Sequence, residues 1–146
     1  MSVLVDTNVL LRRTQPNHAS HAAAVESVAN LLGSGEPVCF TPQNISEFWN
    51  VITRPTASNG LGFSAFMAAA EVGKIELVLT LLPDAAAIYG EWKRLVTRHG
   101  VLGSKVHDAR LVAAMNVHHV RRILTFNVAD FARYNIEVLH PPALLP

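Results

Sequence analysis

The feature that most constrains the fold is the alternation of short apolar runs with stretches of helical periodicity. Four runs have the length and composition of β-strands, and a fifth run is possible. They are Val3 to Val5, Val38 to Phe40, Arg122 to Thr125 and Ile136 to Leu139, with Glu76 to Thr80 as the possible fifth. Short buried strands that alternate with helices are typical of a parallel sheet covered on both faces. We therefore expect an α/β fold in the form of an α/β/α sandwich, with a central parallel sheet of four to five strands.

Five stretches between these runs have the pattern of helices. They are residues 17–35, 41–55, 62–73, 84–100 and 103–117. The stretch 41–55 has the clearest boundaries, because Thr41 can cap it, Pro42 suits its first turn and Arg54–Pro55 ends it. Ser104 is a plausible cap for the last stretch. A length of 146 residues fits all of these elements into a single domain, residues 1–146.

Composition narrows the possible chemistry. The only cysteine, Cys39, rules out an internal disulfide and a CxxC zinc site. The sequence has neither an apolar run of roughly 18 to 20 residues, which a membrane span needs, nor the pattern of an export signal. We therefore expect a cytoplasmic protein. The formal net charge of +1 is too small to predict a nucleic-acid partner by itself.

Polar residues follow the ends of the predicted strands, where parallel sheets place their functional sites. Asp6 comes directly after Val3 to Val5, and Thr7 and Asn8 could orient its carboxylate by hydrogen bonding. Asp is also a common helix cap, so this stretch alone fits either role. Near the C-terminus, "LTFNVADF" places Asn127 and Asp130 after the strand that ends at Thr125. A simple turn would explain these two residues equally well.

Two further acids lie on predicted helices. Glu47 falls opposite the apolar row that begins at Ile45, which fits either a solvated helix face or the wall of a cleft. Asp108 begins a segment, continuing to Val117, that is apolar on nearly every side. A carboxylate in such a segment needs a hydrogen-bonding partner or a cation. Because Mg²⁺ and Mn²⁺ prefer oxygen ligands, converging acids would suit metal-assisted hydrolysis of a phosphodiester. The seven histidines show no zinc-binding spacing, and we expect them to be structural or on the surface.

Four stretches in this order, "VLVDTNVLLR", "ISEFWNVITRP", "KVHDARLVAAM" and "ILTFNVADF", resemble the PIN-domain family. The closest resemblance is to the VapC-type ribonuclease toxins of prokaryotic toxin–antitoxin pairs, and it covers essentially the whole chain. The resemblance implies an endoribonuclease that depends on Mg²⁺ or Mn²⁺. It also implies a homodimer and a cognate antitoxin that inserts a basic side chain near the acids.

The resemblance also implies roles for individual residues. Asp6, Glu47 and Asp108 match the first three acids of the family, which would hold the metal and the attacking water. Thr7 or Asn8 would support Asp6. The fourth acid of the family usually lies two residues after the last motif's Thr, and this sequence has Asn127 there.

This departure leaves two alternatives. Either Asn127 is a neutral ligand or water-positioning group, or Asp130 supplies the charge, and we favour Asp130 and one firmly held metal. RNA contacts would come from arginines near the acids in sequence, namely Arg12, Arg13, Arg54 and Arg110. The alternative function is a non-catalytic PIN-like module that binds RNA or protein and whose site is disabled by Asn127.

Overall fold

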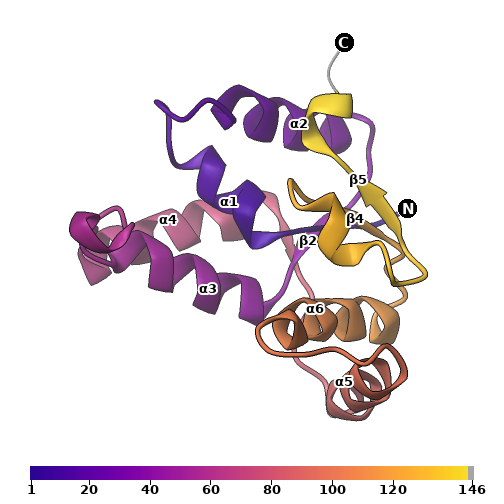
Figure 1. Cartoon of the computed structure of the whole chain (residues 1–146). Coiled ribbons are helices and arrows are strands. Elements are labelled where there is room, and N and C mark those ends of the chain that lie inside the picture. The colour runs from indigo at the N-terminus through magenta and orange to yellow at the C-terminus, as the bar shows by residue number, and fades with distance from the viewer. Residues whose placement is uncertain (145–146) are drawn as a thin grey trace.

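The computed structural model describes residues 1–144, in which five parallel strands form one sheet in the order β3-β2-β1-β4-β5 (Figure 1). The strands are β1 (Val3–Val5), β2 (Val38–Phe40), β3 (Thr80–Leu81), β4 (Arg122–Leu124) and β5 (Glu137–Leu139). The α-helices of this range are α1 (Thr7–Arg13), α2 (His21–Gly33), α3 (Pro42–Thr53), α4 (Ala65–Val78), α5 (Ala87–Arg98) and α6 (Lys105–Val117). Short 3₁₀ helices are η1 (Thr56–Ser58), η2 (Val128–Phe131) and η3 (Pro141–Leu144). The predicted α/β/α sandwich is confirmed.

The two faces of the sheet bury separate apolar layers. Successive side chains of a strand point to opposite faces. Val3 and Val5 accordingly pack with α1, α2, α3 and α4, while Leu4 between them packs with α5 and α6. All three residues are fully buried. The central strand β1 thus carries the core on both sides, and its carboxyl end lies between the two helical layers.

The predicted boundaries of α3 are correct. The hydroxyl of Thr41 accepts from the backbone N–H of Asn44, and the Asn44 side chain accepts from the backbone N–H of Thr41. Pro42 occupies the first turn, where its missing N–H costs nothing. Arg54 is extended before Pro55, which stops the helix.

Two predictions about local structure were wrong. Residues Glu76 to Val78 belong to α4, and only Thr80 and Leu81 form the fifth strand. Helix α4 continues past Gly73 because burial of Ile75 against the sheet layer outweighs the roughly 1 kcal/mol that a helical glycine costs. Ser104 precedes α6 as expected, but its backbone is helical and its side chain donates or accepts no capping bond.

Within residues 1–144, no helix combines the length and the apolar character needed to cross a membrane.

Candidate active site

The carboxyl ends of β1 and β4 bring together residues that are far apart in the sequence. These strands are paired so that Val5 lies beside Leu124. Asp6 therefore meets Thr125, whose hydroxyl donates to the Asp6 carboxylate at 2.8 Å. Asn8 also contacts this pair, because its amide nitrogen donates to the Thr125 hydroxyl at 3.2 Å. Asp6 and Thr125 are both buried, so the carboxylate is held in one orientation.

Asp6 also caps α1, since its side chain accepts from the Thr7 backbone N–H at 2.7 Å. The two roles that the sequence left open are compatible, because one carboxylate oxygen accepts from Thr7 and the other from Thr125.

Glu47 is fixed to the same end of the sheet through Thr7. The Thr7 hydroxyl donates to one Glu47 carboxylate oxygen at 2.8 Å. The same hydroxyl accepts from the side chain of Asn44 at 3.1 Å, and Asn44 is fully buried. Glu47 therefore points toward the end of β1, and the two acids Asp6 and Glu47 are joined through Thr7, whose N–H donates to one and whose hydroxyl donates to the other.

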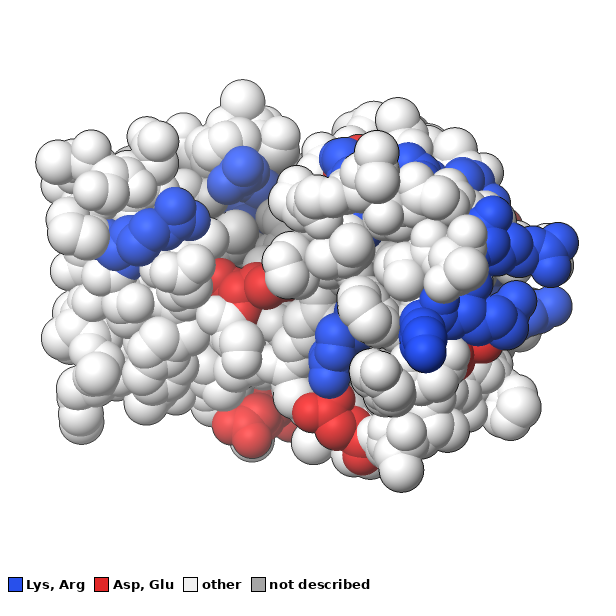
Figure 2. Space-filling model, turned by 60° about the horizontal axis from the view of Figure 1, so that its bottom comes forward, with Lys and Arg blue, Asp and Glu red and all other residues white. Residues whose placement is uncertain are grey.

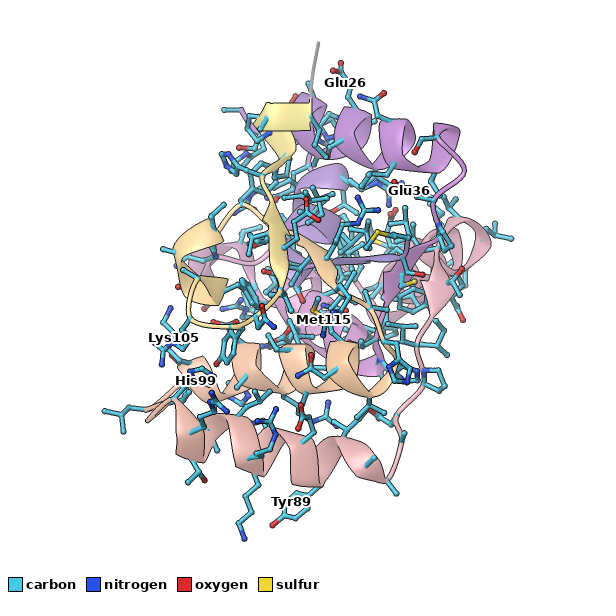
Figure 3. All side chains as sticks on the ribbon, turned by 90° about the vertical axis from the view of Figure 1, so that its right-hand side faces the viewer. Glu26, Glu36, Tyr89, His99, Lys105 and Met115 are labelled. Carbon is cyan, nitrogen blue, oxygen red and sulfur yellow. The ribbon has the colours of Figure 1, made fainter. Side chains whose placement is uncertain are left out.

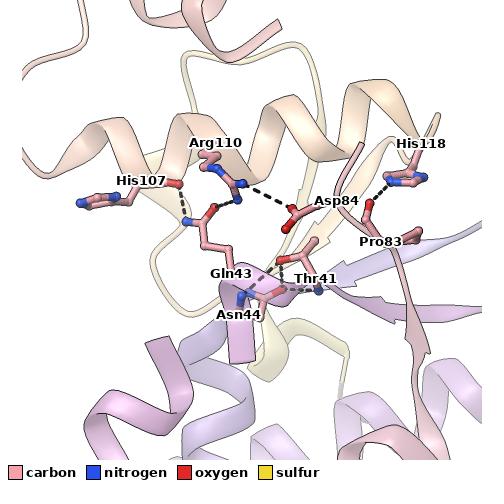
Figure 4. A network of polar contacts seen from close by, with 8 residues as sticks. All are labelled: Thr41, Gln43, Asn44, Pro83, Asp84, His107, Arg110 and His118. Carbon is pink, nitrogen blue, oxygen red and sulfur yellow. Dashed lines mark hydrogen bonds and ion pairs between the residues drawn. The ribbon is translucent and has the colours of Figure 1, made fainter. Parts of the chain in front are cut away.

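A polar network fixes the start of α3 to the start of α6 (Figure 4). The Gln43 side chain donates to the carbonyl of His107 at 2.8 Å and accepts from Arg110 at 3.2 Å. Arg110 also forms an ion pair with Asp84 at 3.3 Å. Asp108 lies between the two α6 residues of this network, so the network sets its position relative to Glu47.

Asp108 and Asp130 lie close enough to repel each other. Burial is the main cause that raises the pKa of Asp108 to about 6, and repulsion from Asp130 is the next. Lys105 opposes this effect and forms an ion pair with Asp130 at 2.6 Å. Asp108 and Asp130 are half-buried, so their charges act on each other through a partly dry medium.

Asp6 experiences the same combination of burial and repulsion. Burial raises the pKa of Asp6 to about 6, although the hydrogen bonds from Thr125 and from the Thr7 N–H lower it. The carboxylates of Asp108 and Glu47 raise the pKa further by repulsion. The structure thus brings all four predicted acids into one electrostatically coupled group.

Asn127 does not join this group through its side chain. It is exposed, and its backbone N–H donates to Thr125 at 3.0 Å. Within residues 1–144 the side-chain amide of Asn127 makes no hydrogen bond. The neutral side chain of Asn127 is thus unengaged, whereas Asp130 adds a negative charge beside Asp108.

The acids fit a hydrated divalent cation better than a closed metal cage. In the described part of the chain, no three Asp, Glu, His or Cys side chains stand close enough to hold one ion together. Mg²⁺ retains several waters and needs only one or two direct carboxylates. Two carboxylates with raised pKa values, Asp6 and Asp108, are groups whose ionised forms a cation would stabilise.

Three residues that contact the acids or their partners were not predicted from the sequence. The sequence marks Thr125 only as the end of a strand, although its position opposite Asp6 follows from strand pairing. Lys105 lies one helical turn before Asp108, and this spacing was the available signal. Asn44 gave no signal, because its contact with Thr7 depends on the packing of α1 against α3.

Two of the four arginines predicted near the acids bind other side chains. Arg110 is bound to Gln43 and Asp84, and the Arg12 guanidinium donates to Gln15 at 2.6 Å. Burial lowers the pKa of Arg13. Arg54 is half-buried, and its Nε makes no hydrogen bond within the described residues.

Comparisons with known proteins agree with this architecture. The family model described as PIN domain matches residues 3–137. VapC20 of Mycobacterium tuberculosis, described as a sarcin–ricin loop cleaving toxin, has 21% identity and a TM-score of 0.69. The match covers 94% of this chain and 98% of that one.

Two complexes contain chains of similar fold. VapBC2 from Rickettsia felis, bound to a promoter DNA fragment, matches at 14% identity and a TM-score of 0.69, covering 96% and 98% of the two chains. A toxin–antitoxin complex from Klebsiella pneumoniae matches at 16% identity and a TM-score of 0.66, covering 95% and 97%. At such identities these likenesses concern the fold. None of the curated proteins compared with the sequence gives a significant match.

Proposed function

Because the chain belongs to the PIN-domain family, we propose that it is a cytoplasmic endoribonuclease that depends on Mg²⁺ or Mn²⁺ and acts as the toxin of a toxin–antitoxin pair. The observation that carries this proposal is the coupling of Asp6, Glu47, Asp108 and Asp130 at the carboxyl end of the sheet. Asp6 is buried and the other three acids are half-buried, and negative charges placed together in this way are costly without a cation. Membership in the PIN-domain family supports nuclease chemistry, and the carboxylates of the site are ligands that suit a divalent cation.

Asp6 and Asp108 are the residues that would hold the cation directly, and Glu47 would act on it through a coordinated water. A bound divalent cation lowers the pKa of coordinated water and stabilises the charge that develops on the phosphate. Asp6 contributes an oriented carboxylate, because Thr125 and the Thr7 N–H fix both of its oxygens.

Glu47 is suited to receive a proton from the attacking water. The Thr7 hydroxyl occupies its Oε1, and Oε2 makes no hydrogen bond within the described residues. Thr7 and Asn8 position Glu47 and Asp6, respectively. Asp130 adds negative charge beside Asp108, and Lys105 limits the resulting repulsion.

The proposed partners are RNA, an antitoxin protein and a second copy of this chain. The Klebsiella pneumoniae neighbour is a toxin–antitoxin complex, which supports the antitoxin. Helix α4 supports assembly, because Phe66 and Leu77 are 85% and 87% exposed. Large apolar side chains on an exposed helix are typical of surfaces that become buried in a complex.

Cleavage of a pool of structured RNAs tests the proposal. Purified protein is incubated with the pool in Mg²⁺, Mn²⁺ or EDTA, beside the variants Asp6→Asn and Asp108→Asn. We expect cutting that requires metal and that falls at least about 100-fold in each variant, because several kcal/mol of transition-state stabilisation are lost.

The alternative function is the non-catalytic module that binds RNA or protein. Failure of the wild type both to cut RNA and to bind Mn²⁺ by calorimetry would favour it. The exposed, unengaged side chain of Asn127 is the observation on which this alternative rests.

A further inference from the structure

A hollow rich in arginine lies on the α5–α6 side of the molecule, outside the group of acids. Its volume is about 510 Å³, and its walls come from α5, α6 and the segments on either side of β4 and η2. Four arginines line it, namely Arg94, Arg98, Arg121 and Arg133. The only acid among its lining residues is Glu91. Figure 2 shows Lys and Arg side chains gathered along the right-hand side of the face in view, apart from the acids at its centre.

The charge of Glu91 is already balanced. Arg94 donates to both of its carboxylate oxygens, at 2.6 and 2.9 Å, and Asn116 donates to one of them at 2.7 Å. Arg98, Arg121 and Arg133 are exposed, and within residues 1–144 none forms an ion pair. Three unbalanced guanidinium groups around one hollow repel each other, and a bound anion would relieve that repulsion.

Helix α6 carries both Asp108 and part of the wall of the hollow. Asp108, Val112 and Asn116 follow each other at intervals of four residues, and the last two line the hollow. Asp108 and Asn116 are separated by about 12 Å along the helix axis. Val112 is only 1% exposed, so RNA would reach the hollow over the exposed surface that follows η2 and not along this row.

The segment after η2 borders both places. Asp130 belongs to η2 and faces Asp108, whereas Arg133 and Tyr134 line the hollow. Tyr134 packs edge-on against His99 with their ring centroids 5.1 Å apart. Figure 3 shows His99 and Lys105 at the same end of the α5–α6 pair, the end at which α6 begins. Ala132, Arg133 and Asn135 of this segment are exposed, so the segment offers a surface route between the acids and the hollow.

We propose that the arginine hollow is a phosphate-binding subsite for the RNA backbone beside the scissile bond. This inference rests on the proposed function and extends it to the substrate. The acids alone would repel RNA, so its affinity must come from neighbouring cations. Arginine suits this purpose, because its planar guanidinium binds phosphate oxygens through two parallel hydrogen bonds.

RNA binding measured without cleavage tests the subsite. A fluorescently labelled single-stranded RNA is titrated with protein in EDTA, over a series of salt concentrations, and anisotropy is recorded. The proteins are the wild type, Arg98→Gln, Arg133→Gln and the double variant. Lys93→Gln is the matched control, since Lys93 is an exposed cation on α5 that does not line the hollow.

We expect the double variant to bind at least about tenfold more weakly at low salt. Its slope of log affinity against log salt should fall by about 0.7 for each lost phosphate contact. Lys93→Gln should bind as the wild type does. In cleavage assays the double variant should raise KM and leave kcat within about twofold, because the subsite lies away from the reacting bond.

Equal affinity and equal salt slopes in the wild type and the double variant would overturn the subsite. Poly-glutamate serves as a probe for an acidic protein segment. If the double variant lost binding to poly-glutamate but bound RNA as the wild type does, the subsite would also be overturned, and the hollow would be assigned to such a segment. The two proposals fail separately. A wild type that binds RNA through these arginines and never cuts it contradicts the nuclease. A double variant that cuts RNA with the wild-type KM contradicts the subsite.

Discussion

The hydroxyl of Thr125 donates to the carboxylate of Asp6 at 2.8 Å, although 119 positions separate the two residues in the sequence. Pairing of β1 with β4 creates this contact, because both residues directly follow the strands. The same hydroxyl accepts from Asn8 and from the Asn127 N–H. One buried threonine thus holds the acid of the first strand and the loop that follows β4.

Thr125→Val tests this contact. The substitution keeps the shape of the side chain and removes the donor, so the pKa of Asp6 should rise and Mn²⁺ binding should require a higher pH. Stability should fall by about 1–3 kcal/mol, because Asp6 and the Asn127 N–H lose a buried partner. Calorimetric Mn²⁺ titrations across pH measure the first effect and urea unfolding the second. Thr125→Ser retains the hydroxyl and should show the wild-type pH dependence. If Thr125→Val left the pH midpoint of Mn²⁺ binding unchanged, the role of Thr125 would be contradicted.

Asp108 should make the metal-free protein less stable at neutral pH than at mildly acidic pH. The unfolded chain loses this proton near pH 3.8, whereas the folded protein retains it until about pH 6. The folded state therefore binds more protons between these values, and the contribution of Asp108 to stability decreases as pH rises through this window.

Asp108→Asn removes that penalty. We expect a gain of about 1 kcal/mol above pH 6, discounted because the side chain is half-buried, and a melting temperature higher by roughly 3–5 °C. The gain should vanish at pH 4, where the wild-type carboxyl is protonated. Thermal unfolding in EDTA at both pH values measures it. Added Mg²⁺ should then raise the melting temperature of the wild type only, and equal stabilisation of the variant would count against Asp108 as a ligand.

Asp130 and Asn127 should differ in their influence on the metal site. Asp130→Asn removes the repulsion that raises the pKa of Asp108, so the pH midpoint of Mn²⁺ binding should shift downward and cleavage should change with it. Asn127→Ala should leave the midpoint in place, because its side chain is exposed. Unchanged metal affinity and unchanged cleavage in Asp130→Asn would contradict any role of Asp130 at the metal site.

Lys105→Met should act in the opposite direction. Its ammonium group pairs with Asp130 and lowers the pKa of Asp108, so its loss should shift the midpoint of Mn²⁺ binding upward. Lys74→Met is a suitable control, because Lys74 forms a comparable ion pair on α4, away from the acids. A midpoint that moves equally in both variants would indicate a general effect of charge.

The sequence predicted the sheet well because its strands are short apolar runs between clear helix signals. It misjudged Glu76 to Val78, because burial of Ile75 extends α4 past a glycine, and no local pattern indicates that burial. Strand ends and helix starts predicted where Asp6 and Asp108 lie. Lys105 and the arginine hollow depend on how α5, α6 and the segment after η2 pack, and a net charge of +1 conceals that local excess.

Calorimetric titration of wild type and Asp108→Asn with Mn²⁺ at pH 7.5, followed by RNA cleavage in the same buffer, tests the central claim most directly. We expect one firmly bound Mn²⁺ per wild-type chain, with RNA cleavage that requires it. Both should be lost in Asp108→Asn while that variant remains folded. Cleavage that persists in EDTA, or a variant that binds Mn²⁺ as tightly as the wild type, would contradict a metal-dependent nuclease built on these acids.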